Sequence, residues 1–299
     1  MTTQRSLIDI GSTSVKIYLL ENSTLTTLLH KTIYFKEGFS PEGLAQDKKT
    51  ELLVLLSQLK RDYSDTEIKT YATALFRKLT PEAQDALKNE VLTKTAIELI
   101  IISQDEENEY LEKALVGKFH SPKRVILINI GGGSTEIVII QKQRVMQRQN
   151  IDIGVGTIMG TFPSINEDHP EVTHEKMVYD IQKKLPELDL HADTAVNSGG
   201  ELTWMRLGEY NLVRNTLFSD PDHPLMISLK DYMSRNKEVF ETLSLSDLEA
   251  LMPENPKWMS GAKAYNVLSE AICITYGIKM LIPSDSNLIH GVVRSLTEQ

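Results

Sequence analysis

Cysteine, long apolar runs and excess positive charge are all scarce in this chain of 299 residues. Cys273 is the only cysteine, which rules out an internal disulfide and a metal cluster held by thiolates. No apolar run approaches the ~20 residues that a membrane-spanning helix needs. The opening segment, MTTQRSLIDI, lacks the basic and then apolar build of a signal peptide. We therefore expect a cytoplasmic protein with no membrane partner.

The charge balance argues against another class of partner. The chain has 41 acidic and 32 basic residues, which gives a formal net charge of -9. General binding to DNA or RNA depends on clustered Lys and Arg side chains that release counterions from the nucleic-acid backbone. We therefore expect no nucleic-acid partner, whereas an anionic small molecule held in a local pocket stays compatible with this charge.

An internal repeat organises the chain. IDIGSTSVKIYLL (residues 8–20) and INIGGGSTEIVII (residues 128–140) align without a gap. Each copy has the pattern of a strand, a turn of small residues and a second strand. Together with the chain length, this predicts two α/β domains, residues 1–122 and 123–299, with a last helix that can pack back on the first domain. Two such turns facing one cleft could hold an anion between them.

Helix-start residues and apolar periodicity place the other elements. Ser40-Pro41 and Thr80-Pro81 have the form of helix starts, a hydroxyl N-cap followed by proline. The continuous apolar run from Ile97 to Ile102 predicts a buried strand. The remaining strands are predicted at 30–35, 69–72, 144–153, 194–197 and 278–282. The remaining helices are predicted at 106–116, 173–184, 228–240, 246–252, 261–276 and 288–296.

The turns of the repeat are the strongest local signal for ligand binding. Three glycines without Cβ atoms let backbone N–H groups approach phosphate oxygens closely, and the hydroxyls add donors. A plain hairpin turn is the competing interpretation, but it needs only two permissive residues. The absence of GxxxxGK[ST] excludes a P-loop. The candidate phosphate-binding residues are Gly11, Ser12, Thr13 and Ser14 in the first copy and Gly131, Gly132, Gly133, Ser134 and Thr135 in the second.

Three further segments have both a structural and a functional interpretation. The acid-rich ISQDEENEYLEKAL is typical of a solvated helix start, but it directly follows a buried strand, where one acid could orient a water molecule. NSGGE, residues 197–201, is either a plain strand-to-helix turn or a ligand contact. GVGTIMG, residues 154–160, has the wrong glycine spacing for a dinucleotide fingerprint, and we interpret it as a strand-to-helix turn near the site.

Seven segments in order resemble one known family. They are IDIGSTSVKIYLL, YATALFRK, IIISQDEENEYLEKALVG, VILINIGGGSTEIVI, NIDIGVGTIMGTF, AVNSGGELTWM and IPSDSNLIHGVV. Together they resemble the exopolyphosphatase and guanosine pentaphosphate phosphohydrolase (Ppx/GppA) family of the actin-like ATPase superfamily, over nearly the whole chain. The resemblance implies an α/β fold of two actin-like (ribonuclease H-like) domains that face an interdomain cleft.

The resemblance also implies a reaction and its residues. It implies Mg²⁺-dependent release of terminal phosphate from polyphosphate or a guanosine polyphosphate, and it allows for a homodimer. Glu107 matches the catalytic glutamate, Glu136 the residue that positions metal or water, and Arg77 the arginine that grips phosphate. Besides the two turns, Asp9, Ser198, Gly199 and Gly200 are expected near phosphate. The expected ligands of Mg²⁺ are Asp9, Glu107, Asn129 and Glu136.

Several positions depart from the family pattern. Asn129 stands where the family has Asp, and arginines of the family are replaced by Glu109, Thr157, Ser286 and Ile289, while Glu201 replaces a threonine. Most of these changes make the region less positive, which is unfavourable for a long polyanion. Two alternatives therefore stay open. One is a relative that binds a phosphorylated ligand without turnover, and the other is a small-metabolite kinase or ATPase in which Glu201 serves a ribose hydroxyl.

Overall fold

The computed structural model describes residues 4–22, 24–115, 123–217 and 222–297. The chain divides into two compact units, Met1–Ala114 with Leu288–Gln299, and Leu115–Asn287. The predicted boundary at 122/123 falls outside the described residues. The predicted second range, 123–299, includes the closing helix, which the structure groups with the first unit. None of the described helices is long and apolar enough to cross a membrane.

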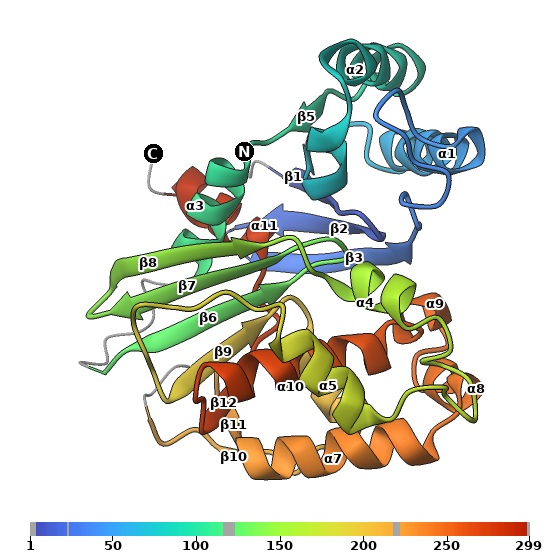
Figure 1. Cartoon of the computed structure of the whole chain (residues 1–299). Helices are drawn as coiled ribbons and strands as arrows, with labels where there is room; N and C mark the ends of the chain where they lie inside the picture. Colours follow the sequence, from blue (N-terminus) through green and yellow to red (C-terminus); the bar gives the residue numbers. More distant parts are fainter. Residues whose placement is uncertain (1–3, 23, 116–122, 218–221, 298–299) are drawn as a thin grey trace. The chain divides into compact units, whose positions relative to one another are not determined.

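The first unit is built on a five-stranded mixed sheet in the order β3-β2-β1-β4-β5 (Figure 1). β1 is antiparallel to β2 and parallel to β4. The strands are β1 (Arg5–Ile10), β2 (Ser14–Glu21), β3 (Thr24–Thr32), β4 (Glu67–Ala72) and β5 (Leu99–Ile101). The helices are α1 (Gln46–Asp62), the short 3₁₀ helix η1 (Ala74–Lys78), α2 (Pro81–Thr95), α3 (Gln104–Leu115) and α11 (Leu288–Thr297).

Side-chain alternation along the strands supplies this sheet with two buried faces. On one face, Ile8 and Ile10 join a core with Leu52 and Leu56 of α1. On the other face, Leu7 packs with Leu20 of β2 and with apolar residues of α11. The closing helix therefore completes the core of the unit in which the chain begins.

The second unit is built on a seven-stranded mixed sheet in the order β10-β11-β12-β9-β6-β7-β8. Its core joins the sheet to helices α4, α5, α7 and α10. The strands are β6 (Val125–Ile130), β7 (Thr135–Gln141), β8 (Arg144–Ile151), β9 (Thr194–Ser198), β10 (Val213–Arg214), β11 (Leu225–Ser228) and β12 (Met280–Pro283). The helices are α4 (Val155–Thr161), α5 (His174–Gln182), α6 (Glu201–Leu207), α7 (Leu229–Thr242), α8 (Leu245–Ala250), α9 (Pro256–Met259) and α10 (Ala262–Thr275).

The predicted repeat is confirmed as a repeated hairpin. β1–β2 and β6–β7 pair in the same register, with Ile10 opposite Val15 and Ile130 opposite Thr135. The same backbone hydrogen bond closes both turns: Gly11 N–H donates to the Ser14 carbonyl at 2.9 Å, and Gly131 N–H donates to the Ser134 carbonyl at 2.8 Å. Each unit therefore begins with the same strand–turn–strand structure.

Local helix signals succeeded at Thr80 and failed at Ser40. Thr80 caps α2, because its hydroxyl accepts from the Ala83 N–H and Pro81 follows at the first helical position. The prediction of a helix from Pro41 is wrong, because Ser40 and Gly43 exchange two backbone hydrogen bonds of 3.0 Å. That closed turn delays the start of α1 to Gln46.

Candidate functional site

The start of α3 is held in place by a reciprocal cap. Ser103 N–H donates to the Glu106 carboxylate at 2.7 Å, and Glu106 N–H donates to the Ser103 hydroxyl at 3.1 Å. This capping box satisfies N–H groups that have no partner within the helix. It begins α3 directly after β5, which is why the next residue, Glu107, occupies a defined position close to that strand.

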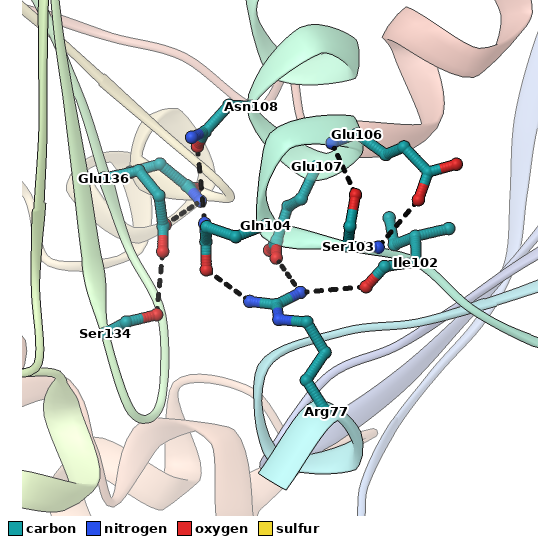
Figure 2. Close-up of polar contacts among 10 residues, drawn as sticks. Arg77, Ile102, Ser103, Gln104, Glu106, Glu107, Asn108, Ser134 and Glu136 are labelled. Carbon is teal, nitrogen blue, oxygen red and sulfur yellow. Dashed lines mark hydrogen bonds and ion pairs between the residues drawn. The ribbon is translucent and has the colours of Figure 1, made fainter. Parts of the chain in front are cut away.

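Glu107 forms an ion pair with Arg77 from η1 (Figure 2). The Arg77 Nη1 lies 2.6 Å from the Glu107 Oε2 and also donates to the Ile102 carbonyl at 3.3 Å. The Arg77 Nη2 donates to the Gln104 side-chain oxygen, and Gln104 in turn donates to Asn108 at 3.4 Å. The Ile102 carbonyl and Gln104 therefore fix the guanidinium that holds the Glu107 carboxylate, and the Arg77 and Glu107 side chains are only 20% and 13% exposed.

The acids of the α3 segment have separate roles. Glu106 caps the helix, and Glu109 lies on the surface, 61% exposed, where it pairs with Lys113 at 2.7 Å. Burial raises the pKa of Glu107 above its usual range, although the Arg77 charge opposes this shift. A carboxylate whose pKa is moved toward neutral is suited to accept a proton near pH 7.

Asp9 is the second acid of this unit with an altered pKa. Burial raises the pKa of Asp9 to about 6, with Lys16 acting in the opposite direction and Glu107 adding to the rise. The turn that follows Asp9 is held from outside, since the Ser12 and Thr13 carbonyls accept from the Phe35 and Ile33 N–H groups at 3.1 and 3.0 Å. The Glu107 carboxylate therefore acts on Asp9 electrostatically, as a second acid near one site would.

In the second unit, Glu136 is 2% exposed and lies in a set of neutral donors. The Asn129 amide donates to its Oε2 at 2.9 Å, and the Ser134 hydroxyl donates to its Oε1 at 2.7 Å. The Ser198 hydroxyl donates to the side-chain oxygen of Asn129 at 3.3 Å, which orients the Asn129 side-chain amide. Thr135 is fully buried and its hydroxyl donates to the Ile153 carbonyl at 2.7 Å. The turn thus places the Ser134 hydroxyl against Glu136, and Thr135 fixes the turn to the chain at Ile153.

The start of α4 packs directly on the glycine turn. Val155 and Gly156 N–H groups donate to the Gly131 and Gly132 carbonyls at 3.0 and 2.8 Å. A Cβ on Gly154 would lie only 2.6 Å from the Gly133 nitrogen, so this close approach requires glycine. The segment GVGTIMG leads from β8 into a helix as predicted, but it is mostly helix itself, because only Gly154 precedes α4. Sequence reasoning missed its role as the support of the turn, for which Gly154 was the available signal.

The NSGGE segment is engaged by the chain that follows β12. Gly199 and Gly200 have φ of 101° and 126°, in the region that favours glycine, and their N–H groups donate to the Ser286 and Ser284 carbonyls. Glu201 is 2% exposed, and burial raises its pKa to about 8. Its side chain is therefore part of the interior of this unit.

The residues present fit only in part a cation that prefers oxygen ligands, such as Mg²⁺. Within the described segments, no group of three or more His, Cys, Asp or Glu side chains is placed to hold a metal ion. Mg²⁺ commonly uses one or two carboxylates together with water and phosphate oxygens. Besides burial, the Glu107 charge raises the pKa of Asp9, an effect that a cation would relieve, whereas Glu136 already accepts two neutral hydrogen bonds.

Comparison with known proteins identifies the family. A model described as the Ppx/GppA phosphatase family matches residues 8–219. This chain belongs to that family. A search of curated proteins gave no match. Among solved structures, the Ppx/GppA family member of Aquifex aeolicus has 21% identity and a TM-score of 0.73, covering 100% of this chain and 98% of that one. An exopolyphosphatase from Cytophaga hutchinsonii has 14% identity and a TM-score of 0.78, covering 99% and 98%. These similarities show that the fold is that of the Ppx/GppA structures.

The positions that depart from the Ppx/GppA pattern lie in different surroundings. Ile289 belongs to the core beneath α11, and Glu201 is buried. Thr157 accepts from the Gly154 N–H at 3.3 Å within α4. Asn129 and Ser286 contact predicted site residues, because the Asn129 amide donates to Glu136 and the Ser286 carbonyl accepts from the Gly199 N–H. Gln104 and Asn108, which orient Arg77, were not predicted from the sequence, because nothing local indicates which polar residues of an acidic helix face an arginine 27 residues earlier.

Proposed function

We propose that this protein is a cytoplasmic, Mg²⁺-dependent phosphohydrolase that releases terminal phosphate from inorganic polyphosphate or guanosine pentaphosphate. The observation that carries the proposal is the Arg77–Glu107 pair, fixed by Gln104 and by the Ile102 carbonyl. Membership of the Ppx/GppA phosphatase family supports it. The turn of small residues in the first hairpin of each unit, which we expect to bind phosphate, supports it as well.

Glu107 is the proposed general base. Its Oε2 is bonded to Arg77, which leaves Oε1 to orient a water molecule toward the terminal phosphorus. As the water oxygen bonds to phosphorus, its proton passes to Glu107 and the P–O anhydride bond breaks, so the shortened phosphate chain leaves as an oxyanion. Such proton transfer contributes about 10²–10⁴-fold to rate.

Arg77 and the two turns are the proposed phosphate contacts. A guanidinium gives a fixed positive charge for the charge that develops in phosphoryl transfer, and backbone N–H groups add fixed dipoles. Mg²⁺, when held through Asp9, would neutralise further charge on the phosphate oxygens. That both turns face a single cleft stays a prediction.

Two alternatives have observations that bear on them. A kinase or ATPase in which Glu201 serves a ribose is disfavoured, because that side chain is 2% exposed. A binding protein without turnover would be favoured if the altered residues crowded the site. Glu109 instead lies on the surface and Glu201 in the interior, while Asn129 donates to Glu136 and the Ser286 carbonyl accepts from Gly199.

The test is phosphate release from polyphosphate and from guanosine pentaphosphate, with and without Mg²⁺. Glu107→Gln keeps the shape but removes the proton acceptor, so kcat should fall by about 10²–10⁴-fold. Glu109→Gln, on the exposed face of the same helix, is the matched control and should keep wild-type kcat.

Three results would contradict the proposal. An unchanged kcat in Glu107→Gln would move the base role elsewhere, with Glu136 the next candidate. Binding of both substrates without phosphate release by the wild type would favour the non-catalytic alternative. Transfer of phosphate to an added alcohol without release would favour the kinase.

A further inference from the structure

A pocket lies in the second unit, at the end of the sheet where strands β6, β9 and β12 begin. It has a volume of about 650 Å³, and its lining includes Lys123, Arg124, His191, Asp193, Gly277 and Lys279. We refer to it as the basal pocket. β6 spans six residues between this end of the sheet and the glycine turn, so the two are roughly 20 Å apart at about 3.3 Å per residue. The basal pocket is therefore separate from the second-unit turn.

The charge of the basal pocket is opposite to that of the chain. Lys123, Arg124 and Lys279 line it against one acid, Asp193, in a protein of net charge -9. Most cations of such an acidic protein have acidic neighbours to pair with. A local excess of positive charge attracts anions even where the net charge is negative.

Two of these cations have no acidic partner in the part of the chain that the structure describes. Neither Arg124 nor Lys279 forms an ion pair there, although Asp193 lines the same pocket. The Arg124 Nε is also buried and has no hydrogen-bond acceptor. A buried donor without an acceptor is unfavourable, by about 1–3 kcal/mol in proteins generally, unless a ligand or water supplies one.

The end of α10 also lines the basal pocket, and a helix C-terminus normally repels anions. Here three carbonyls near the helix end already accept hydrogen bonds. The Ile272, Cys273 and Ile274 carbonyls accept from the Tyr276, Ile278 and Gly277 N–H groups at 3.0, 2.9 and 3.2 Å. Gly277 has φ of 70° and open space at its Cβ position. This capping satisfies those three carbonyls and so lowers the local negative potential.

We propose that the basal pocket is a second anion site, which binds a small phosphate-bearing molecule away from the site of turnover. The guanidinium of Arg124 offers paired donors that match phosphate oxygens, and Lys279 adds a mobile point charge. The volume lies within the range of small-molecule sites in proteins. The proposal concerns binding and does not depend on the hydrolytic activity.

The test uses inorganic pyrophosphate as the probe and lysine acetylation, read by mass spectrometry on the full chain, as the measurement. Lys279 is exposed and should be acetylated several-fold more slowly in the presence of pyrophosphate, at matched ionic strength. Lys184, exposed in the same unit, is the control residue and should react at an unchanged rate. This residue-level measurement separates the basal pocket from pyrophosphate bound at the candidate active site.

Variants complete the test. Arg124→Gln should abolish the protection of Lys279, whereas Arg214→Gln, at an exposed arginine of β10, should leave it intact. Circular dichroism checks that each variant is folded. Equal acetylation of Lys279 with and without pyrophosphate would overturn the proposal. So would equal protection of Lys184, which indicates a general ionic effect, or protection that survives in Arg124→Gln.

Discussion

Asn129 and Asp9 occupy equivalent positions in the repeat but have different partners across the hairpin. Asp9 lies opposite Lys16, and Asn129 lies opposite Glu136. An aspartate at 129 would place two carboxylates directly opposite each other, which is destabilising in a sheet without a cation between them. The amide of Asn129 donates to Glu136 instead, at 2.9 Å. Residue 129 therefore stabilises Glu136 without any need for metal.

The first prediction is that Asn129→Asp makes the second unit respond to Mg²⁺. Without Mg²⁺ the melting temperature should fall, because a hydrogen bond to a charged group, worth about 1.5–3 kcal/mol, is lost. Mg²⁺ should raise the melting temperature of this variant more than that of the wild type. Asn211→Asp, at an exposed position, is the control. Equal Mg²⁺ shifts in all three proteins would show that residue 129 does not govern metal binding.

Glu201 leads to a prediction about pH. Burial, with a further contribution from Asp285, raises its pKa from 4.5 to about 8, while Tyr265 acts in the opposite direction. The folded protein therefore holds this proton more tightly than the unfolded chain. The stability that this tighter proton binding gives the folded protein is complete below pH 4.5. It is lost as the pH rises to 8, by at most about 1.4 kcal/mol per pH unit.

Glu201→Gln cannot ionise, so its free energy of unfolding should fall less between pH 5 and pH 8 than that of the wild type. Urea unfolding followed by tryptophan fluorescence reports on this unit, because both tryptophans, Trp204 and Trp258, lie within it. Parallel pH profiles for the two proteins would mean that Glu201 keeps the same protonation in the folded and unfolded states.

At the scale of elements, the glycine turn depends on the helix packed behind it. α4 donates two backbone hydrogen bonds to the turn carbonyls, and Gly154 permits the close approach. In the first unit, the corresponding support comes from the backbone of Ile33 and Phe35. Equivalent turns are thus supported by different elements, which explains why the supporting segments show no repeat in sequence.

Gly154→Ala should separate α4 from the turn. The added methyl group would meet backbone atoms that cannot move independently, so we expect a loss of about 1–3 kcal/mol in the free energy of unfolding. Gly160→Ala is the matched control, because that exposed helical glycine has open space around it and should gain about 0.5–1 kcal/mol. Urea denaturation measures both, and equal effects of the two substitutions would contradict the packing argument.

At the scale of the whole molecule, charge bears on the choice of substrate. The net charge of -9 is unfavourable for a long polyanion, and Ile289 and Ser286, which replace family arginines, are buried. A long chain needs cations well beyond the reacting phosphate, whereas a short polyphosphate or a nucleotide needs few. Mg²⁺ would then supply charge that arginine side chains do not.

The resulting prediction is a weak preference for long polyphosphate and a steep requirement for Mg²⁺. The measurement is kcat/KM against chain length at two Mg²⁺ concentrations. A strong increase with length at low Mg²⁺ would reveal a basic track along the protein, contrary to the charge argument.

The sequence by itself determined the features that depend on neighbouring residues. The two hairpins, the cap of α2, the helices α5 and α7 and the strand before α3 were all predicted, because turns and helix starts are stabilised by groups a few residues apart. Family membership also followed from motifs in their order along the chain. Gln46 as the start of α1 was missed, since the closed turn at Ser40 overrides the proline signal.

Only the tertiary structure decided which members of each motif have a functional environment. Glu106, Glu107 and Glu109 are equivalent in an acidic run, but only Glu107 meets Arg77, a residue 30 positions away. Burial of Glu201 likewise depends on contacts between distant segments, and so does the grouping of α11 with the first unit, which the sequence allowed but did not decide. Local patterns carry no information about such contacts, because desolvation and ion pairing arise only when the chain has folded and brought these side chains together.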